Sequence, residues 1–231
     1  MIPPIYSHTL IRNGEPLTKL IFKNILPFVD KCLVTISERS DDDTLASLQD
    51  LQSVYRDKMV IDTENTQIPA QLTQVRQKML DATPKDTWVL FLDDDDYWSV
   101  EQLKEMKNLL KRNEDVDGYS LNPYQVIDKT RYDHSWRNKY FLKWFKNQDG
   151  IHYKGAWPRD LVYKGDELLY WRKNPRVPRL LTRYFHLSYI KRWSFRREPW
   201  AKEYAMAVGR IAPYPKELQK ELTKIFKYVK Q

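Results

Sequence analysis

Cysteine is nearly absent from this sequence of 231 residues, since Cys32 is the single one. A chain with one cysteine cannot form an internal disulfide, so no cross-linked scaffold is possible. The length is sufficient for a sizeable hydrophobic core in one domain. Cys32 falls in a predicted buried strand, where we expect it to act as a small core residue.

Glycine and long apolar runs are scarce as well. The chain has 6 Gly, and neither Gly-x-Gly-x-x-Gly nor the Walker A pattern occurs, which excludes these two phosphate-cradling loops. No stretch approaches the roughly 18 apolar residues of a membrane span, and nothing resembles a secretory signal. We therefore expect a cytoplasmic protein without a transmembrane segment, with peripheral contact to a membrane surface as an alternative.

The longest acidic run in the sequence is four adjacent aspartates at 93–96, which follow the apolar run 89–92. Four like charges repel each other, and carboxylate oxygens suit hard cations such as Mg²⁺ or Mn²⁺ that neutralise them. The alternative is an acidic, solvated turn. The apolar run is typical of a strand buried on both faces, and Ser99 behind it is typical of a helix N-cap. The aspartates thus occupy the carboxyl end of a central strand, where open α/β sheets bind ligands.

Strands and helices alternate through the first 98 residues. Residues 5–11, 32–37 and 59–62 are typical of strands, and residues 70–80 carry apolar side chains at helical spacing. With the strand before the aspartates, four strands alternate with three helices. This βαβαβαβ order predicts a parallel sheet covered by helices.

The segment Phe-Leu-Asp-Asp-Asp-Asp-Tyr-Trp at 91–98 resembles the Leu-Asp-x-Asp-Asp-x-Trp motif of GT-A glycosyltransferases, in particular family 2. The resemblance implies an α/β fold of the GT-A, Rossmann-like type, with a mostly parallel sheet flanked by helices. It implies a single glycosyltransferase domain over residues 1–231. In that domain, 1–128 would bind the nucleotide-sugar donor, and the basic, aromatic-rich region 129–231 would bind the acceptor.

The same resemblance assigns roles to the aspartates. Asp93 would face the ribose, Asp95 would hold the metal, and Asp96 would lie beside them. The loop 12–15 resembles the family's first nucleotide-contacting loop. The residues expected to contact the donor are Thr9, Arg12, Asn13, Glu38, Asp42, Arg76, Asp93 and Asp94.

Two of these matches are looser than the aspartate motif. Ser40, Asp42 and Thr44 lie on the positions of the family's Gly-Ser-x-Asp-x-Thr, but Arg39 replaces the glycine. Arg76 lies where the family often has an Ala-Arg-Asn stretch whose Arg approaches the donor. A solvated helix residue is the equally good alternative for Arg76.

His186 stands in Tyr-Phe-His-Leu-Ser, which resembles the late His-x-Ser segment of many family members. There the His meets the metal or the diphosphate, so the expected metal ligands are Asp95, Asp96 and His186. The alternative is a structural His, since histidine is often merely structural. The other histidines are weaker candidates, because His8 falls within the first predicted strand, and His134 and His152 have no motif around them.

An inverting transfer needs a general base, normally Asp or Glu, to deprotonate the acceptor hydroxyl. The family's usual Val-His-Glu segment is missing from this sequence. The second half is poor in acidic residues, and its segments 155–160 and 163–167 resemble a late strand of the family and the loop after it. The resemblance therefore makes Asp160, Asp166 and Glu167 the candidates, with Arg159 as a phosphate contact. The alternative for each carboxylate is a surface salt bridge.

Charge is divided unevenly along the chain. Residues 129–231 contain 25 Lys and Arg against 9 Asp and Glu, a net charge of +16, whereas the first 128 residues have a net charge of −8. The basic part also holds 6 of the 8 Trp and 10 of the 15 Tyr. Interleaved basic and aromatic residues suit a polyanion or an anionic membrane surface. Many of these aromatics will also fill the core.

The sequence therefore predicts a metal-dependent, hexosyltransferase-like glycosyltransferase that uses Mn²⁺ or Mg²⁺, a nucleotide-sugar donor and an acidic acceptor. Acceptor candidates are DNA or RNA with a modified base, a phosphate-containing cell-surface polymer, and a lipid at an anionic membrane. Two other functions stay open. A Mg²⁺-dependent nuclease or phosphoryl-transfer enzyme would need a second carboxylate cluster, for which residues 41–43 are the one candidate. A non-catalytic polyanion-binding protein would explain the missing base motif.

The last predicted helix covers residues 214–228. Leu218, Leu222, Ile225 and Phe226 recur at helical spacing, with Lys and Glu between them. We expect this narrow apolar stripe to dock on the core. A helix lying on a membrane surface is the less favoured alternative.

Overall fold

The computed structural model describes residues 3–65, 69–112, 115–133, 139–156, 161–170, 174–191, 209–211 and 214–229. The first half alternates strands and helices as predicted: β1 (Ile5–Ile11), α1 (Thr18–Ile25), β2 (Lys31–Ser37), α2 (Thr44–Val54), β3 (Met59–Glu64), α3 (Pro69–Asp81), β4 (Thr87–Phe91), β5 (Asp96–Tyr97) and α4 (Val100–Arg112). Strands dominate the second half: β6 (Gly118–Val126), β7 (Arg131–Asp133), β8 (Phe141–Asn147), β9 (Ile151–Lys154), β10 (Leu161–Lys164), β11 (Glu167–Leu168), β12 (Arg179–His186), the short α5 (Ser188–Ile190), β13 (Gly209–Ile211) and α7 (Lys216–Val229).

Ten strands form the main sheet, in the order β13-β7-β6-β8-β4-β1-β2-β3, with β12 beside β6 and β5 beside β12. The neighbours β4, β1, β2 and β3 run parallel to one another, as the alternation of elements predicts. The added strand β8 runs antiparallel between β4 and β6. Strands β9, β10 and β11 form a separate three-stranded sheet. The expected mixed α/β architecture, with helices flanking a central sheet, is confirmed.

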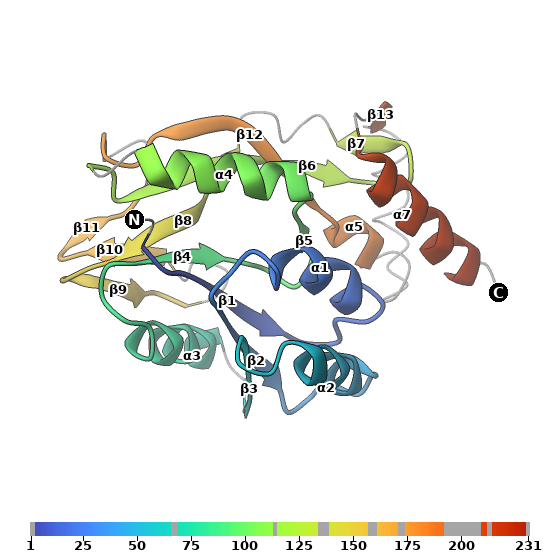
Figure 1. Ribbon diagram of the computed structural model, residues 1–231, viewed down its shortest axis with the longest axis horizontal. Helices are drawn as coiled ribbons and strands as arrows, with labels where there is room; N and C mark the ends of the chain where they lie inside the picture. The colour runs from blue at the N-terminus through green and yellow to red at the C-terminus, as the bar shows by residue number, and fades with distance from the viewer. Residues whose placement is uncertain are drawn as a thin grey trace.

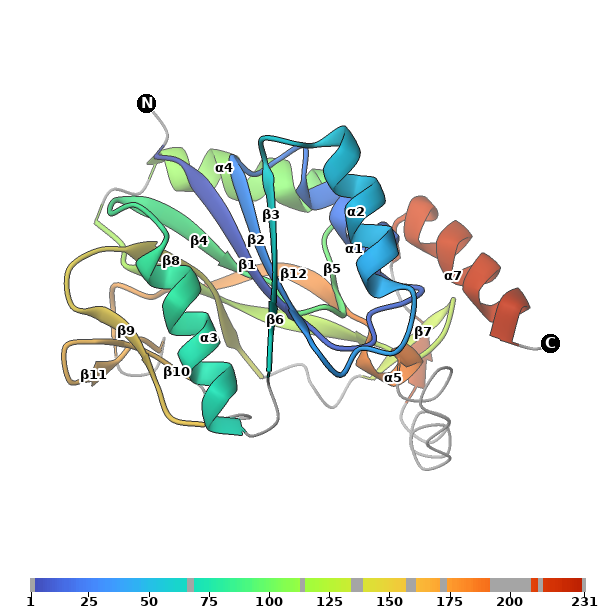
Figure 2. The same cartoon turned by 90° about the horizontal axis from the view of Figure 1, so that it is seen from below.

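Helices cover both faces of the four parallel strands, with α1 and α2 on one side and α3 on the other (Figure 1, Figure 2). Alternate side chains of a strand point to opposite faces, so β4 supplies residues to two cores. Trp88 and Leu90 belong to the larger cluster, which also contains α1 and α4 side chains. Val89 belongs to the smaller cluster with Leu80 of α3 and residues of β9 and β10. The apolar run before the aspartates is therefore buried on both faces, as expected.

The predicted N-cap of α4 and the predicted core-facing stripe of α7 are both confirmed. The Ser99 hydroxyl accepts the backbone N–H of Gln102 at 3.3 Å, and the Gln102 side chain accepts the Ser99 N–H at 2.8 Å, which is a capping box before α4. Leu218 and Leu222 of α7 are fully buried in the larger core cluster. Among the described residues, none of the helices has both the length and the apolar character that a membrane span requires.

Candidate functional site

The predicted loops meet at one edge of the sheet, because β1, β2 and β4 are parallel and their carboxyl ends lie side by side. The backbone N–H of Arg12, after β1, lies 3.4 Å from Oδ2 of Asp94, after β4. The Asn13 side chain donates to Oδ1 of Asp41, after β2, at 2.6 Å. This is the ligand-binding edge of an open α/β sheet.

Hydrogen bonds fix the loops after β1 and β2 to each other. Asp42 accepts the backbone N–H of Glu15 at 3.0 Å and that of Thr44 at 3.1 Å. The Thr44 hydroxyl in turn accepts the Gly14 N–H at 2.8 Å. A Cβ at position 14 would lie 2.8 Å from both Ile11 Cγ2 and the Thr18 hydroxyl, so tight packing within the turn after β1 favours glycine there. Asp42 therefore shapes the predicted nucleotide-contacting loop.

His186 reaches the aspartates through strand pairing. The last residue of β12 is His186, and it pairs with Asp96 in the antiparallel ladder between β12 and β5. Its Nδ1 atom lies 2.9 Å from Oδ1 of Asp96 and 3.3 Å from Oδ1 of Asp95. The backbone N–H of Leu187 donates to the carbonyl of Asp95 at 2.7 Å, which holds the two chain segments together.

Asp95, Asp96 and His186 offer ligand atoms that all lie within 4.8 Å of one another. Two carboxylates and one imidazole form a mixed oxygen and nitrogen donor set, which suits first-row divalent cations such as Mn²⁺. The Asp96 side chain is fully buried, whereas 14% of the Asp95 side chain and 19% of His186 are exposed. The group thus opens to solvent on one side, and its chemistry fits a divalent cation.

Asp93 contacts two buried cations. Its Oδ2 lies 2.6 Å from Nζ of Lys143, and its Oδ1 lies 3.2 Å from the Arg76 guanidinium, which stacks 3.8 Å from the Phe91 ring centroid. Burial alone would raise the pKa of Asp93, but Lys143 and Arg76 together hold it below its ordinary value. Asp93 is therefore ionised at neutral pH. Arg76 is buried and is not a solvated helix residue, and its role toward the donor stays a prediction.

Asp94 faces a different cation. The Lys191 ammonium contacts its Oδ2 atom, and both side chains are largely buried. Burial raises the pKa of Asp94 above its ordinary value, although the Lys191 charge opposes the shift. Asp93 and Asp94 are therefore each paired with a cation of the chain.

The charge on His186 depends on its neighbours. Burial would lower the pKa of this imidazole, but Asp95 and Asp96 raise it to about 9. At neutral pH, without a metal, the ring is protonated and bonds to the carboxylates. A cation that uses the ring nitrogen as a ligand must displace this proton.

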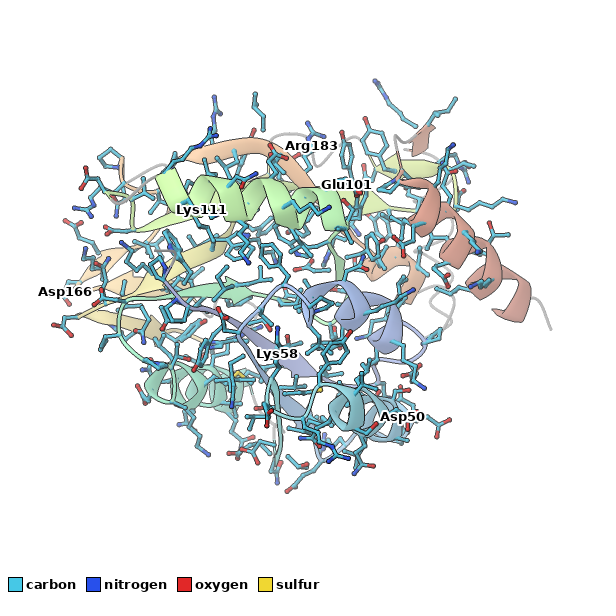
Figure 3. All side chains as sticks on the ribbon, in the orientation of Figure 1. Asp50, Lys58, Glu101, Lys111, Asp166 and Arg183 are labelled. Carbon is cyan, nitrogen blue, oxygen red and sulfur yellow. The ribbon has the colours of Figure 1, made fainter. Side chains whose placement is uncertain are left out.

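The remaining predicted residues are scattered. Thr9 is buried within β1, and Glu38 is exposed just after β2. Asp166 and Glu167 are exposed on the hairpin of β10 and β11, well away from β5 in Figures 1 and 2, and Asp166 marks that end of the molecule in Figure 3. Asp160 and Arg159 lie outside the described residues. The roles proposed for all of these residues stay predictions.

Lys143 and Lys191 are site residues that the sequence patterns did not reveal. Lys143 stands between Leu142 and Trp144 in an apolar strand. A Lys flanked by apolar residues in such a strand is a signal, because lysine is almost never fully buried unless it is paired. Lys191 is only 5% exposed directly after α5 and carried no comparable pattern.

The strand order and the helices on both faces of the sheet are consistent with a GT-A type of α/β fold. Residues 26–160, more than half of the chain, match the family model described as Glycosyl transferase family 2. The chain therefore belongs to glycosyl transferase family 2. No curated protein matches the sequence.

One solved structure agrees with this fold. The crystal structure of S. aureus TarS 1-349 is similar over 98% of this chain and 71% of that chain, with 14% sequence identity and a TM-score of 0.53. A longer crystallised chain of S. aureus TarS is similar over 53% of this chain, with 18% identity and a TM-score of 0.40. This chain spans 22% of the length of that longer protein. At such identities the likeness establishes the fold alone.

Proposed function

We propose that the chain is a metal-dependent glycosyltransferase that moves a sugar from a nucleotide-sugar donor to an acidic acceptor. One observation carries the proposal, namely the convergence of Asp95, Asp96 and His186 at the carboxyl edge of the sheet. Asp93 and Asp94 lie in the same loop. The family match supports the reaction class.

Charge development explains why such a site suits sugar transfer. A departing nucleoside diphosphate gathers negative charge, and a bound Mn²⁺ or Mg²⁺ supplies the Lewis acid that offsets it. Asp95, Asp96 and His186 would hold this cation. The loop of Arg12 and Asn13, held by the residues after β2, supplies a rigid wall for the nucleotide.

The proposed acceptor is a polyanion. The net charge of +16 on residues 129–231 exceeds what solubility alone requires, and it lies in the half that holds the acceptor in GT-A enzymes. A nucleic acid with a modified base is our first candidate, because basic and aromatic residues are interleaved. A phosphate-containing polymer and a membrane lipid are the other candidates.

We propose an inverting mechanism, with Asp160, Asp166 or Glu167 as the general base. Asp166 and Glu167 can serve this role only if the acceptor spans the distance to Asp95 or the hairpin moves toward it. The two-metal nuclease alternative has no support, because within the described ranges Asp95, Asp96 and His186 are the one group of metal ligands.

A thermal-shift panel tests the proposal. The protein is heated with Mn²⁺ together with UDP, GDP, TDP or their sugar conjugates, and with each compound in EDTA. We expect one nucleotide series to raise the melting temperature in Mn²⁺ and not in EDTA, because a ligand that binds the native state stabilises it. A panel without any metal-dependent shift would contradict the proposed donor. Binding without sugar transfer or donor hydrolysis would favour the non-catalytic alternative.

A further inference from the structure

Lys143 is a buried cation that joins two of the aspartates. Its side chain is 3% exposed, and its Nζ atom lies 2.6 Å from Oδ2 of Asp93 and 2.5 Å from Oδ2 of Asp96. The antiparallel register of β8 and β4 pairs Trp144 with Leu90, so Lys143 lies one residue beyond that pair, at the carboxyl end of β4. The backbone therefore places the ammonium beneath the aspartate loop.

The two oxygens of Asp96 have different partners. Oδ2 accepts from the Lys143 ammonium and from the backbone N–H of Asp93, at 2.5 and 3.2 Å. Oδ1 faces His186 Nδ1 at 2.9 Å. Because Lys143 and the Asp93 N–H occupy Oδ2, Oδ1 is the oxygen that Asp96 presents to the group formed with Asp95 and His186.

We infer that Lys143 is a positioning residue of the metal site, which holds Asp96 so that it offers a single oxygen to the cation. The inference rests on the proposed metal-dependent function. Lys143 itself does not touch the cation or the substrate. It acts through Asp96, as hydrogen-bonded partners of metal ligands generally do.

The same contacts divide the aspartate run into two parts. Arg76 and Lys143 engage the two oxygens of Asp93, at 3.2 and 2.6 Å. Asp93 is thus neutralised by cations of the chain and is not needed as a metal ligand. Asp95 and Asp96 are left to hold the metal with His186.

A purely structural role for Lys143 predicts a different outcome. The ammonium lies 4.9 Å from the centroid of the Tyr184 ring and 5.4 Å from that of Phe91, so Lys143 also contributes to the packing beside aromatic residues. Lys143→Met keeps an unbranched stem and removes the charge. Melting temperature alone cannot separate the two roles, whereas metal affinity can.

The test is calorimetric titration of the folded protein with Mn²⁺ alone, for the wild type, Lys143→Met and Lys146→Met. Lys146 is a matched control on the same strand, half-buried beside Trp88 and outside the aspartate group. We expect Lys143→Met to bind Mn²⁺ about 10- to 100-fold more weakly, as is usual when a partner of a metal ligand is lost. Lys146→Met should match the wild type.

The outcomes distinguish a failure of the metal site from a failure of the Lys143 role. If the wild type does not bind Mn²⁺, the proposed metal-dependent function fails. If the wild type binds and folded Lys143→Met binds equally well, the positioning role of Lys143 is overturned while the metal site stands. Equal losses in Lys143→Met and Lys146→Met would overturn it too, because general charge would then explain the effect.

A second pair of variants covers a failure of Lys143→Met to fold. Asp93→Asn removes one buried carboxylate, and the double variant Asp93→Asn with Lys143→Met removes the opposing charge as well. Asp93→Asn should keep the Mn²⁺ affinity of the wild type, because Asp93 is not a ligand. The double variant should lose about 10- to 100-fold relative to Asp93→Asn. Equal affinity of the two would contradict the inference.

Discussion

His186 Nδ1 lies 2.9 Å from Oδ1 of Asp96, although 90 residues separate the two in the chain. Pairing of β12 with β5 creates this contact, and it brings the basic second half of the chain to the acidic loop of the first half. The proposed metal site therefore forms only when both halves are folded together.

Replacement of His186 tests its assignment as a metal ligand. His186→Ala should lower Mn²⁺ affinity and turnover by ~10-fold or more, because a ligand atom is removed. Its melting temperature without metal should stay close to that of the wild type. His152→Ala, in the three-stranded sheet, is the control. A large drop in melting temperature with turnover preserved per folded molecule would make His186 a core residue instead.

His8 should make the native state sensitive to acid. It is fully buried, and its Nε2 atom lies 2.7 Å from the Thr83 hydroxyl. Burial, and then the charge of Arg76, lower the pKa of His8 to about 3. Below about pH 6.5, the pKa of histidine in the unfolded chain, His8 binds a proton in the unfolded state but stays neutral in the native state. For each pH unit below about 6.5, His8 therefore lowers the free energy of unfolding by up to about 1.4 kcal/mol.

Urea unfolding of the wild type and of His8→Gln between pH 7 and pH 5 measures this contribution. The comparison with the variant is necessary because His186, with its pKa raised to about 9, stabilises the native state below pH 6.5 and loses that effect as pH rises through 9. We expect the stability of His8→Gln to fall less steeply with acid than that of the wild type. Parallel curves would show that His8 does not differ in protonation between the two states.

Polyanion binding should depend steeply on salt. A region of net charge +16 releases counterions when it binds nucleic acid, so affinity for DNA should fall by orders of magnitude from low to moderate salt. Replacing Arg192, Arg196 and Arg197 together by Ala should flatten that slope and impair transfer to the acceptor, yet leave donor hydrolysis nearly unchanged. These three residues lie outside the described part of the structure, and the prediction rests on their charge.

Filter binding across a salt series, with anionic liposomes in parallel, measures the effect. Binding to DNA or RNA that weakens with salt supports a nucleic-acid acceptor. If liposomes bind and neither nucleic acid binds at low salt, the acceptor is a lipid, and the preference for nucleic acid is wrong.

Local sequence patterns could predict the strands and the meeting of their ends. The apolar run before Asp93 and the parallel order of β1, β2 and β4 depend on short-range periodicity and on general rules of α/β folds. For His186, the sequence supplied a family resemblance, and the pairing of β12 with β5 supplied the geometry.

The cations around the aspartates could not be predicted in the same way. Lys143 reaches Asp93 and Asp96 across 50 and 47 residues, because β8 inserts antiparallel beside β4. Lys191 reaches Asp94 across 97 residues. Nothing in local periodicity encodes such pairings. The expectation that four adjacent carboxylates require a metal thus omitted the cations that the fold supplies.

Metal-dependent turnover of a nucleotide sugar is the decisive property of the proposed enzyme. The donor identified by thermal shift is incubated with the protein, and release of nucleoside diphosphate is measured in Mn²⁺ and in EDTA, for the wild type and Asp95→Ala. We predict release by the wild type in Mn²⁺, little release in EDTA, and little release by Asp95→Ala in either condition despite an intact fold. Equal release by the wild type in Mn²⁺ and in EDTA, or full activity of Asp95→Ala, would contradict a metal-dependent transfer at this site.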